Sequence, residues 1–238
     1  MGDRIQKIIS ASGLMSRRAA EAAIAAGRVT HNGRTATVGE SARPDDEILV
    51  DGEALPRQEE KLYILLNKPR GVVTTLHDEK GRRNVSALVN MDGARLYPVG
   101  RLDMDSEGLL LMTNDGAFAN RVMHPSHEVD KTYLVWVKGG ELDRASQILA
   151  GPMEIDGHPI RPASVEIKER FPDGGVLEIT IHEGRNRQIR KMCAQAGLSV
   201  TRLVRVAEGG VRLGGLKSGC WRKLTPEEID MLLGEGER

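Results

Sequence analysis

A polar segment at residues 53–60 divides the chain into two unequal parts. The segment contains a proline and has neither helical nor strand periodicity, which is typical of a linker. Short helical and hairpin patterns precede it, whereas a longer series of strand-like and helical patterns begins at residue 61. The 238 residues are enough for two domains that each bury a core. We therefore expect a small domain over residues 1–52, a linker over 53–60 and a larger domain over 61–238.

The first part has the pattern of two short helices followed by a hairpin. Ile5 and Ile9 lie on one helical face, and Gly13 can end that helix in a left-handed conformation. Ser16 can cap the start of a second, alanine-rich helix. The Asn-Gly pair at residues 32–33 is a strong signal for a tight turn between two strands. The predicted order is helix, helix, hairpin.

The formal charge of the chain is zero, but its distribution is uneven. Residues 1–37 hold six Lys or Arg and two Asp or Glu, a net charge of +4, which leaves −4 for the remainder. A compact basic end on a mildly acidic body is typical of a small module that binds a polyanion. In the larger part, residues 185–205 hold six Lys or Arg and no Asp or Glu, so no acidic neighbour in this stretch neutralises them.

Three short motifs of the first part are similar to those of the S4 RNA-binding domain. They are RIxK at residues 4–7, SRR at 16–18 and GRVxxNG at 27–33, and the resemblance covers residues 3–52. It implies that basic side chains of this part contact RNA phosphates. A basic helix face that is simply exposed to solvent is the alternative. The candidate RNA-binding residues are Arg4, Lys7, Arg17, Arg18, Arg28 and Arg34.

The larger part alternates short apolar runs with helical patterns. This order predicts an α+β domain built on a mixed, largely antiparallel sheet with flanking helices. The expected strands cover residues 63–66, 72–75, 109–113, 131–137, 163–169, 176–182 and 201–206, and the expected helices cover 116–123, 143–150, 188–196 and 226–233.

A glycine-bounded loop at residues 100–108 concentrates charge directly before an apolar run. Its carboxylates suggest three chemistries. Calcium binding is disfavoured, because an EF-hand needs a glutamate at its twelfth position and Asn114 stands there. Hydrolysis of a sugar bond by two carboxylates and catalysis by one aspartate held ionised by an arginine are both compatible with the spacing. An exposed acidic turn without a function is a fourth interpretation.

Alternation within this loop favours a functional side chain at Asp103. If the loop is extended, Arg101, Asp103 and Asp105 point to one side. Leu102 and Met104 then point to the other side, where Leu102 can anchor the loop in the core. Asp103 is left facing a cleft.

Three segments of the larger part are similar to motifs of the RsuA/RluB family of ribosomal RNA pseudouridine synthases. They are GRLDxxSEGLLLxTNDG at residues 100–116, KTY at 131–133 and EGRNRQIRKM at 183–192. With the S4-like part before them, the resemblance covers essentially the whole chain, and the run at 183–192 and NKPRG at 67–71 are most similar to the large-subunit, B-type enzymes. The resemblance implies isomerisation of a uridine in ribosomal RNA to pseudouridine, with no cofactor and no metal.

The resemblance also assigns roles to particular residues. Asp103 matches the essential catalytic residue, which acts either on the sugar carbon or as a base that allows a glycal intermediate. Arg190 matches the arginine that pairs with this aspartate and opposes the cost of burying a carboxylate. Tyr133 matches the tyrosine that lies against the target uracil, and Ile189 is expected on the pocket wall. The expected contacts to phosphate are Arg101, which can instead brace the loop, and Arg185, Arg187 and Lys191.

The remaining sequence signals limit cofactors, partners and location. There is no phosphate-binding glycine loop, dinucleotide motif or His/Cys metal cluster, and Cys193 and Cys220 form no metal or disulfide motif. No apolar run is long enough to span a membrane, and no secretory signal is visible. We expect a cytoplasmic monomer that acts on ribosomal RNA, with 23S favoured, or on a pre-ribosomal particle.

Three rival functions stay open at this point. A 16S ribosomal RNA pseudouridine synthase would use the same site on a different RNA. A catalytically inactive S4-type RNA-binding or ribosome-assembly protein would bind RNA without isomerising it. A glycoside hydrolase would use Asp103 with Asp105 or Glu107, although seven aromatic residues in the whole chain provide few surfaces for stacking a sugar.

Overall fold

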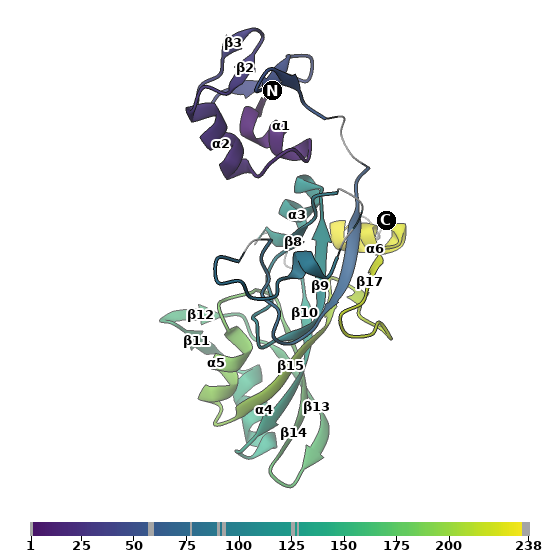
Figure 1. Ribbon diagram of the computed structural model, residues 1–238. Coiled ribbons are helices and arrows are strands. Elements are labelled where there is room, and N and C mark those ends of the chain that lie inside the picture. Colours follow the sequence, from purple (N-terminus) through teal and green to yellow (C-terminus); the bar gives the residue numbers. More distant parts are fainter. Residues whose placement is uncertain are drawn as a thin grey trace. The chain divides into compact units, whose positions relative to one another are not determined.

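The computed structural model describes residues 2–56, 60–76, 78–89, 91, 94–124, 127 and 129–234. The chain divides into two compact units, one formed mainly by the first 62 residues and the other by most of the remainder (Figure 1). Each unit has a hydrophobic core of its own.

The small unit packs two helices against short strands. Its helices are α1 (Ile5–Ala11) and α2 (Arg17–Ala25). One sheet has the order β3 (Arg34–Thr35), β2 (Val29–His31), β5 (Ile48–Val50) and β6 (Glu53–Ala54), and β1 (Asp3–Arg4) pairs separately with β4 (Ser41–Ala42). Ile5, Ile9, Ile24, Val29 and Val50 lie in its core.

Local sequence signals account for the turns of the small unit. Ser16 caps α2 by accepting a hydrogen bond from the Ala19 N–H, as predicted. Asn32 and Gly33 have φ values of 48° and 79°, which form the predicted hairpin turn. Strand β6 lies within the segment predicted as a linker, and residues 57–59 of that segment fall outside the described residues. The domain boundary stays a prediction.

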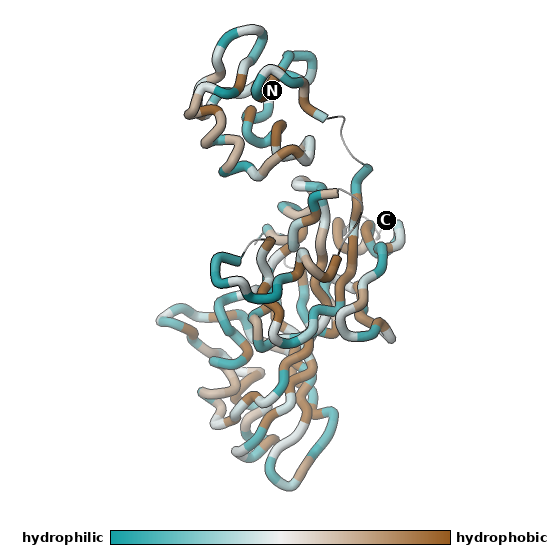
Figure 2. Tube along the Cα trace, in the orientation of Figure 1, coloured by the Kyte–Doolittle hydropathy of each residue, from teal (hydrophilic) through white to brown (hydrophobic). Residues whose placement is uncertain are grey.

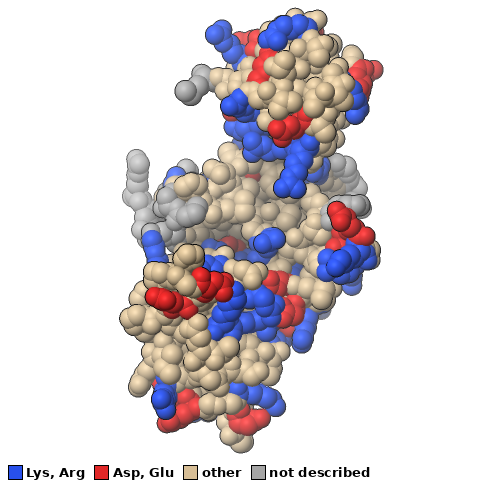
Figure 3. Space-filling model, turned by 90° about the vertical axis from the view of Figure 1, so that its left-hand side faces the viewer, with Lys and Arg blue, Asp and Glu red and all other residues tan. Residues whose placement is uncertain are grey.

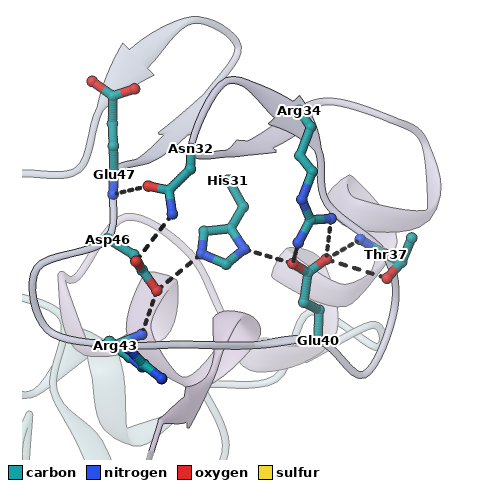
Figure 4. Close-up of polar contacts among 8 residues, drawn as sticks. All are labelled: His31, Asn32, Arg34, Thr37, Glu40, Arg43, Asp46 and Glu47. Carbon is teal, nitrogen blue, oxygen red and sulfur yellow. Dashed lines mark hydrogen bonds and ion pairs between the residues drawn. The ribbon is translucent and has the colours of Figure 1, made fainter.

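A polar network around His31 fixes the two loops that flank β4, between β3 and β5 (Figure 4). His31 Nδ1 lies 2.5 Å from Glu40 Oε1, and Nε2 lies 3.1 Å from Asp46 Oδ2. Hydrogen bonds to the Glu40 carboxylate lower its pKa to about 2, and the bond from the Thr37 N–H has a larger effect than the one from His31. The Arg43 N–H is the main group that holds the pKa of Asp46 below its usual range. Hydrogen bonds to the two carboxylates raise the pKa of His31.

The larger unit is built on one mixed sheet. Within the described residues its order is β13 (Ser164–Phe171), β14 (Gly174–Ile181), β10 (Lys131–Lys138), β15 (Ser199–Glu208), β9 (Glu107–Thr113), β7 (Tyr63–Lys68) and β17 (Trp221–Lys223), with β8 (Tyr97–Val99) paired to β9 and β16 (Val211–Arg212) paired to β15. Among the described strands of this sheet, only β15 and β9 pair in parallel, and the other pairs are antiparallel. The predicted fold class is therefore confirmed.

Helices and a small hairpin complete the larger unit. The helices are α3 (Gly116–Met123), α4 (Leu142–Ala150), α5 (Gln188–Gln195), α6 (Pro226–Leu233) and the 3-10 turn η1 (Val85–Ala87), and β11 (Met153–Ile155) pairs with β12 (His158–Ile160). Helix α4 packs on β13, and α5 lies against β15 and β11. No helix in the described part of the chain is long and apolar enough to cross a membrane.

Hydrophobic side chains bury both faces of the central strand β9 in the larger unit. Residues 108–113 of β9 are all buried, so this strand has no solvent-exposed face. Figure 2 shows hydrophobic residues, in brown, along the central strands of the larger unit. Leu109 and Leu111 of β9 pack in one cluster with Phe118 of α3 and Leu232 of α6. Because β9 directly follows the loop of residues 100–106, this core fixes the carboxyl end of that loop.

One expected strand of the larger unit is wrong. In residues 72–75, Val73 forms only an isolated bridge with Asn84. The segment packs instead against the charged loop, since Thr74 Oγ1 donates a hydrogen bond to the Leu102 carbonyl at 2.6 Å. Thr74, one of the β-branched residues that suggested a strand, instead supports the neighbouring loop.

Candidate active site

A cavity of about 920 Å³ opens beside the loop of residues 100–106 in the larger unit. Strands β10 and β15 and the segment before α5 supply the other walls. Six of the predicted site residues line it, namely Arg101, Asp103, Tyr133, Arg185, Arg187 and Ile189. Segments that lie far apart in the sequence therefore meet at one cavity.

The loop that carries Asp103 is anchored as predicted but is not extended throughout. Leu102 is buried, so it holds the loop in the core. Met104 and Asp105 form a turn, and the Ser106 N–H donates to the Asp103 carbonyl at 3.1 Å. The turn breaks the expected alternation, and Met104 is exposed rather than directed into the core.

The turn also separates Asp103 from Asp105 and changes their ion pairs. Asp105 lies 3.1 Å from Arg187 Nη2 and 3.3 Å from Arg190 Nη2. Asp103 Oδ2 lies 3.6 Å from Arg187 Nη1. The expected pairing of Arg190 with Asp103 is thus wrong, because the turn directs Asp105 toward α5 and leaves Asp103 at the cavity.

Asp105 organises the contact between the loop and α5. Arg190 Nη2 also donates to the Asp105 carbonyl at 3.0 Å. Burial opposes ionisation of Asp105, but Arg187 and then Arg190 hold its pKa below the usual range. Burial lowers the pKa of Arg190 despite these carboxylates. The Asp103 side chain is 36% exposed, so it remains accessible to a ligand in the cavity.

Tyr133 and Ile189 form the apolar part of the cavity wall. Tyr133 lies on β10 with only 8% of its surface exposed, and Ile189 is buried near the start of α5. Burial raises the pKa of the Tyr133 phenol, which therefore stays protonated at neutral pH. A protonated phenol can donate a hydrogen bond.

Acids outside the basic stretch at residues 185–205 form ion pairs with it, contrary to the expectation from sequence. Lys191 Nζ lies 2.6 Å from Asp156, and Arg185 Nε lies 3.2 Å from Glu183. Arg202 forms a bidentate pair with Glu107. Figure 3 shows Lys and Arg next to Asp and Glu on one face of the molecule. Lys191 does not line the cavity, whereas Arg101 does and makes no ion pair with the described residues.

The predicted RNA-binding residues of the small unit differ in their availability. Lys7 pairs with Asp3, Arg28 with Asp51, and Arg34 with Glu40. The other three, Arg4, Arg17 and Arg18, are exposed and have no ion-pair partner among the described residues. Arg17 and Arg18 begin α2 and can therefore approach one phosphate backbone together.

Three charged residues near the site were missed by sequence reasoning. Lys68 at the end of β7 is completely buried, and Nζ donates to the Val72 carbonyl at 2.8 Å. Burial lowers the pKa of Lys68 to about 8. Nearby carboxylates oppose this effect, and Asp103 opposes it most. Arg205 and Glu208 are buried at the cavity wall. Lys68 lies in the NKPRG motif and Arg205 in the basic stretch at residues 185–205, but neither they nor Glu208 were assigned to the site from sequence.

Comparisons with known proteins agree with this arrangement. The family model for RNA pseudouridylate synthase matches residues 62–195, and the S4 domain model matches residues 3–48. Ribosomal large subunit pseudouridine synthase B of Bacillus subtilis is 41% identical over 233 residues, which cover 97% of this chain and 95% of that protein. The dual-specificity RNA pseudouridine synthase RluF of Escherichia coli O6:H1 is 38% identical, over 95% of this chain and 77% of its own.

A solved structure described as a pseudouridylate synthase is similar over nearly the whole chain. It superposes with a TM-score of 0.69 at 33% identity and covers 97% of this chain and 99% of its own. The resemblance inferred from the motifs is thereby confirmed. The chain belongs to the RNA pseudouridylate synthase family, as an RNA-modifying isomerase that carries an S4 domain at its amino end.

Proposed function

We propose that this enzyme converts a uridine of 23S ribosomal RNA to pseudouridine and that Asp103 is its catalytic carboxylate. The observation that carries the proposal is the position of Asp103, which lines the cavity together with Tyr133 and Ile189. The B. subtilis relative is named for the large ribosomal subunit, which favours 23S over 16S RNA.

The proposed reaction rearranges bonds within one nucleotide. The bond between N1 of uracil and C1′ of ribose breaks, the base turns, and C5 bonds to C1′. The proton on C5 is then lost and N1 gains a proton, so no oxidant, reductant or cofactor is consumed. Asp103 acts on C1′ or removes a proton from the ribose, and either step requires a carboxylate. Arg187 Nη1 lies 3.6 Å from Asp103 Oδ2 and is its ion-pair partner.

The neighbouring residues bind the extruded nucleotide. Tyr133 offers an aromatic face to the uracil, which has lost its stacking in the RNA, and Ile189 closes the apolar wall. Arg101 and Arg185 line the same cavity and can meet phosphate oxygens at its entrance. Arg190 braces the loop through Asp105 rather than acting on the substrate.

The S4-like unit supplies RNA affinity in this proposal. Arg4, Arg17 and Arg18 are its main phosphate contacts, because the other three candidates are already in ion pairs. The functional boundaries follow the sequence prediction, with residues 1–52 binding RNA, 53–60 linking and 61–238 catalysing. The enzyme acts as a cytoplasmic monomer.

The test is to map pseudouridine in 23S and 16S RNA from a strain that lacks the protein, and to restore it with purified enzyme. We expect one 23S uridine to depend on the enzyme. Asp103→Asn should form no product and still bind RNA, whereas Asp143→Asn, a surface carboxylate on α4 paired with Arg170, should act as wild type. A missing modification in 16S RNA would refute the target, and normal product from Asp103→Asn would refute the catalytic assignment.

A further inference from the structure

Two charged residues of β15, Arg205 and Glu208, are more deeply buried than the predicted catalytic residues. Their exposed fractions are 2% and 3%, and Arg205 Nη2 lies 3.2 Å from Glu208 Oε2. Burying two charges costs free energy that their attraction often fails to offset, so such a pair is weak evidence for a stabilising role. Both residues line the cavity beside Asp103. Their position therefore suggests a role in the reaction.

A β-bulge brings the two side chains together. Residues three apart on a regular strand point to opposite faces of the sheet. In the register between β10 and β15, Val206 has no partner, and the pairing shifts there by one residue. Arg205 and Glu208 consequently meet on the same side of β15. Tyr133 is the direct cross-strand partner of Arg205, and Lys131 is that of Glu208.

Arg205 also contacts the end of the loop that carries Asp103. Its Nε donates to the Leu109 carbonyl at 2.7 Å. Its backbone pairs in parallel with Gly108, where a Cβ atom would lie 2.2 Å from the Arg205 carbonyl oxygen. Only glycine allows this approach of β15 to β9. Arg205 thus holds the carboxyl end of the Asp103 loop through both its backbone and its side chain.

Glu208 completes the contacts on the other side. Its Oε1 lies 4.0 Å from Lys131 Nζ, while Oε2 faces Arg205. Neither Glu208 Oε2 nor Arg205 Nη2 makes a hydrogen bond with the described residues. The charge of Arg205 lowers the pKa of the Tyr133 phenol and that of Glu208 raises it, both on top of the dominant effect of burial.

We propose that Arg205 and Glu208 are positioning residues that fix the Tyr133 side chain in register with the Asp103 loop. Arg205 joins the two elements, since it hydrogen-bonds the loop end and lies directly across from Tyr133. Glu208 holds the Arg205 guanidinium in place through their ion pair. This inference rests on the proposed function, because it assigns the pair to the isomerisation step.

The test compares Glu208→Gln and Arg205→Lys with wild type in single-turnover and steady-state assays on ribosomal RNA. Glu208→Gln is expected to lower kcat by up to about 100-fold, the cost of displacing a reacting group by about 1 Å, with KM unchanged. Arg205→Lys keeps the charge but loses the Nε hydrogen bond, so it should lower kcat as well. The matched control is Glu228→Gln, which breaks an arginine–glutamate pair with Arg222 away from the cavity. That variant should lose stability without losing kcat.

A second measurement separates positioning from a purely structural effect. The ultraviolet difference absorbance of tyrosinate, taken relative to Tyr133→Phe, isolates the titration of Tyr133 from that of the other two tyrosines. Removing the negative charge in Glu208→Gln should lower the pKa of Tyr133, and the alkaline limb of the kcat profile should move to lower pH with it. Arg205→Met with Glu208→Met removes both charges, and it should stay folded with low kcat.

The outcomes are distinct. Wild-type kcat and an unchanged Tyr133 titration in Glu208→Gln would overturn the inference, as would a double variant with normal kcat. If wild type forms no pseudouridine, the proposed function fails, but the tyrosine titration still shows whether Glu208 and Arg205 control Tyr133.

Discussion

Buried charge occurs in both units of the chain, beside His31 in the small one and at Arg205 and Glu208 in the larger one. In the small unit, backbone N–H groups hold the carboxylates: Thr37 donates to Glu40 at 2.9 Å and Arg43 donates to Asp46 at 2.7 Å. The described contacts of the Glu208 carboxylate are instead the side chains of Arg205 and Lys131, and all three residues line the cavity.

The groups that contact the carboxylates indicate which role each polar cluster has. A cluster whose carboxylates are held by backbone donors specifies the path of a loop, because those hydrogen bonds tie each carboxylate to the chain of that loop. A cluster whose carboxylate is contacted by side chains that line a cavity is placed to act on a ligand or a catalytic side chain. Variants in the first cluster should therefore change stability, and variants in the second should change catalysis.

The largest expected effect is that of Asp103→Asn. Loss of the catalytic carboxylate should reduce product formation by about 10⁴-fold, whereas the free energy of unfolding should hardly change because the side chain is partly exposed. The measurement is pseudouridine formation on ribosomal RNA beside a denaturant titration. If Asp103→Asn lost both activity and free energy of unfolding, Asp103 would have a structural role like that of the His31 cluster.

Arg187→Gln and Arg190→Gln should separate the two arginines that meet Asp105. Arg187 also faces Asp103, so its loss should lower kcat by about 100-fold with little change in stability. Arg190 is largely buried and donates to the Asp105 carbonyl, so its loss should lower the free energy of unfolding by about 2 kcal/mol. The reverse result, with Arg190 controlling kcat in a stable protein, would restore the pairing inferred from sequence.

Arg17→Gln with Arg18→Gln should weaken RNA binding without changing kcat. Each lost phosphate contact lowers the slope of log affinity against log salt by roughly 1, so the double variant should lower it by roughly 2. Arg28→Gln is the matched control, since Arg28 is held by Asp51 and should contribute less. Filter binding at several salt concentrations gives the slopes. If wild type and all these variants had equal salt slopes, the small unit would not contact the RNA phosphates.

The smallest expected effect is a pH dependence of stability in the small unit. The folded-state pKa of His31 is raised by Glu40 and then Asp46, whose own pKa values are lowered, so both stay ionised. The stabilisation is therefore complete below the unfolded pKa of about 6.5 and is lost as pH rises through the folded value.

Hydrogen exchange of the β2 and β5 amides, corrected for the intrinsic rate, should show this loss of protection above neutral pH. In His31→Phe the dependence should disappear, while the β10 and β15 amides of the larger unit serve as an internal control. Protection that increases with pH in wild type would contradict the raised pKa of His31.

Much of the local structure was predictable from sequence because it depends on neighbouring residues. The Ser16 cap, the Asn32-Gly33 turn, the four helices of the larger unit and its main strands follow from capping, turn and periodicity signals. Strands β8, β11, β12, β16 and β17 were missed, because each has two or three residues and too little pattern to detect. The anchoring of Leu102 and the meeting of Asp103, Tyr133 and Ile189 at one cavity also follow from the motifs.

By itself the sequence determined the helix caps, the hairpin turn, the apolar faces and the residue types available to the site, since these depend on interactions within a few positions of the chain. Only the tertiary structure decided which charges meet. Because of the turn at Met104–Asp105, Arg190 pairs with Asp105 rather than with Asp103. Because Val206 has no partner on β10, the side chains of Arg205 and Glu208 lie on the same side of β15. Both outcomes depend on a local irregularity of one or two residues, a turn in one case and a β-bulge in the other. Such an irregularity changes the side to which the following side chains point, and it produces no periodic pattern in the sequence.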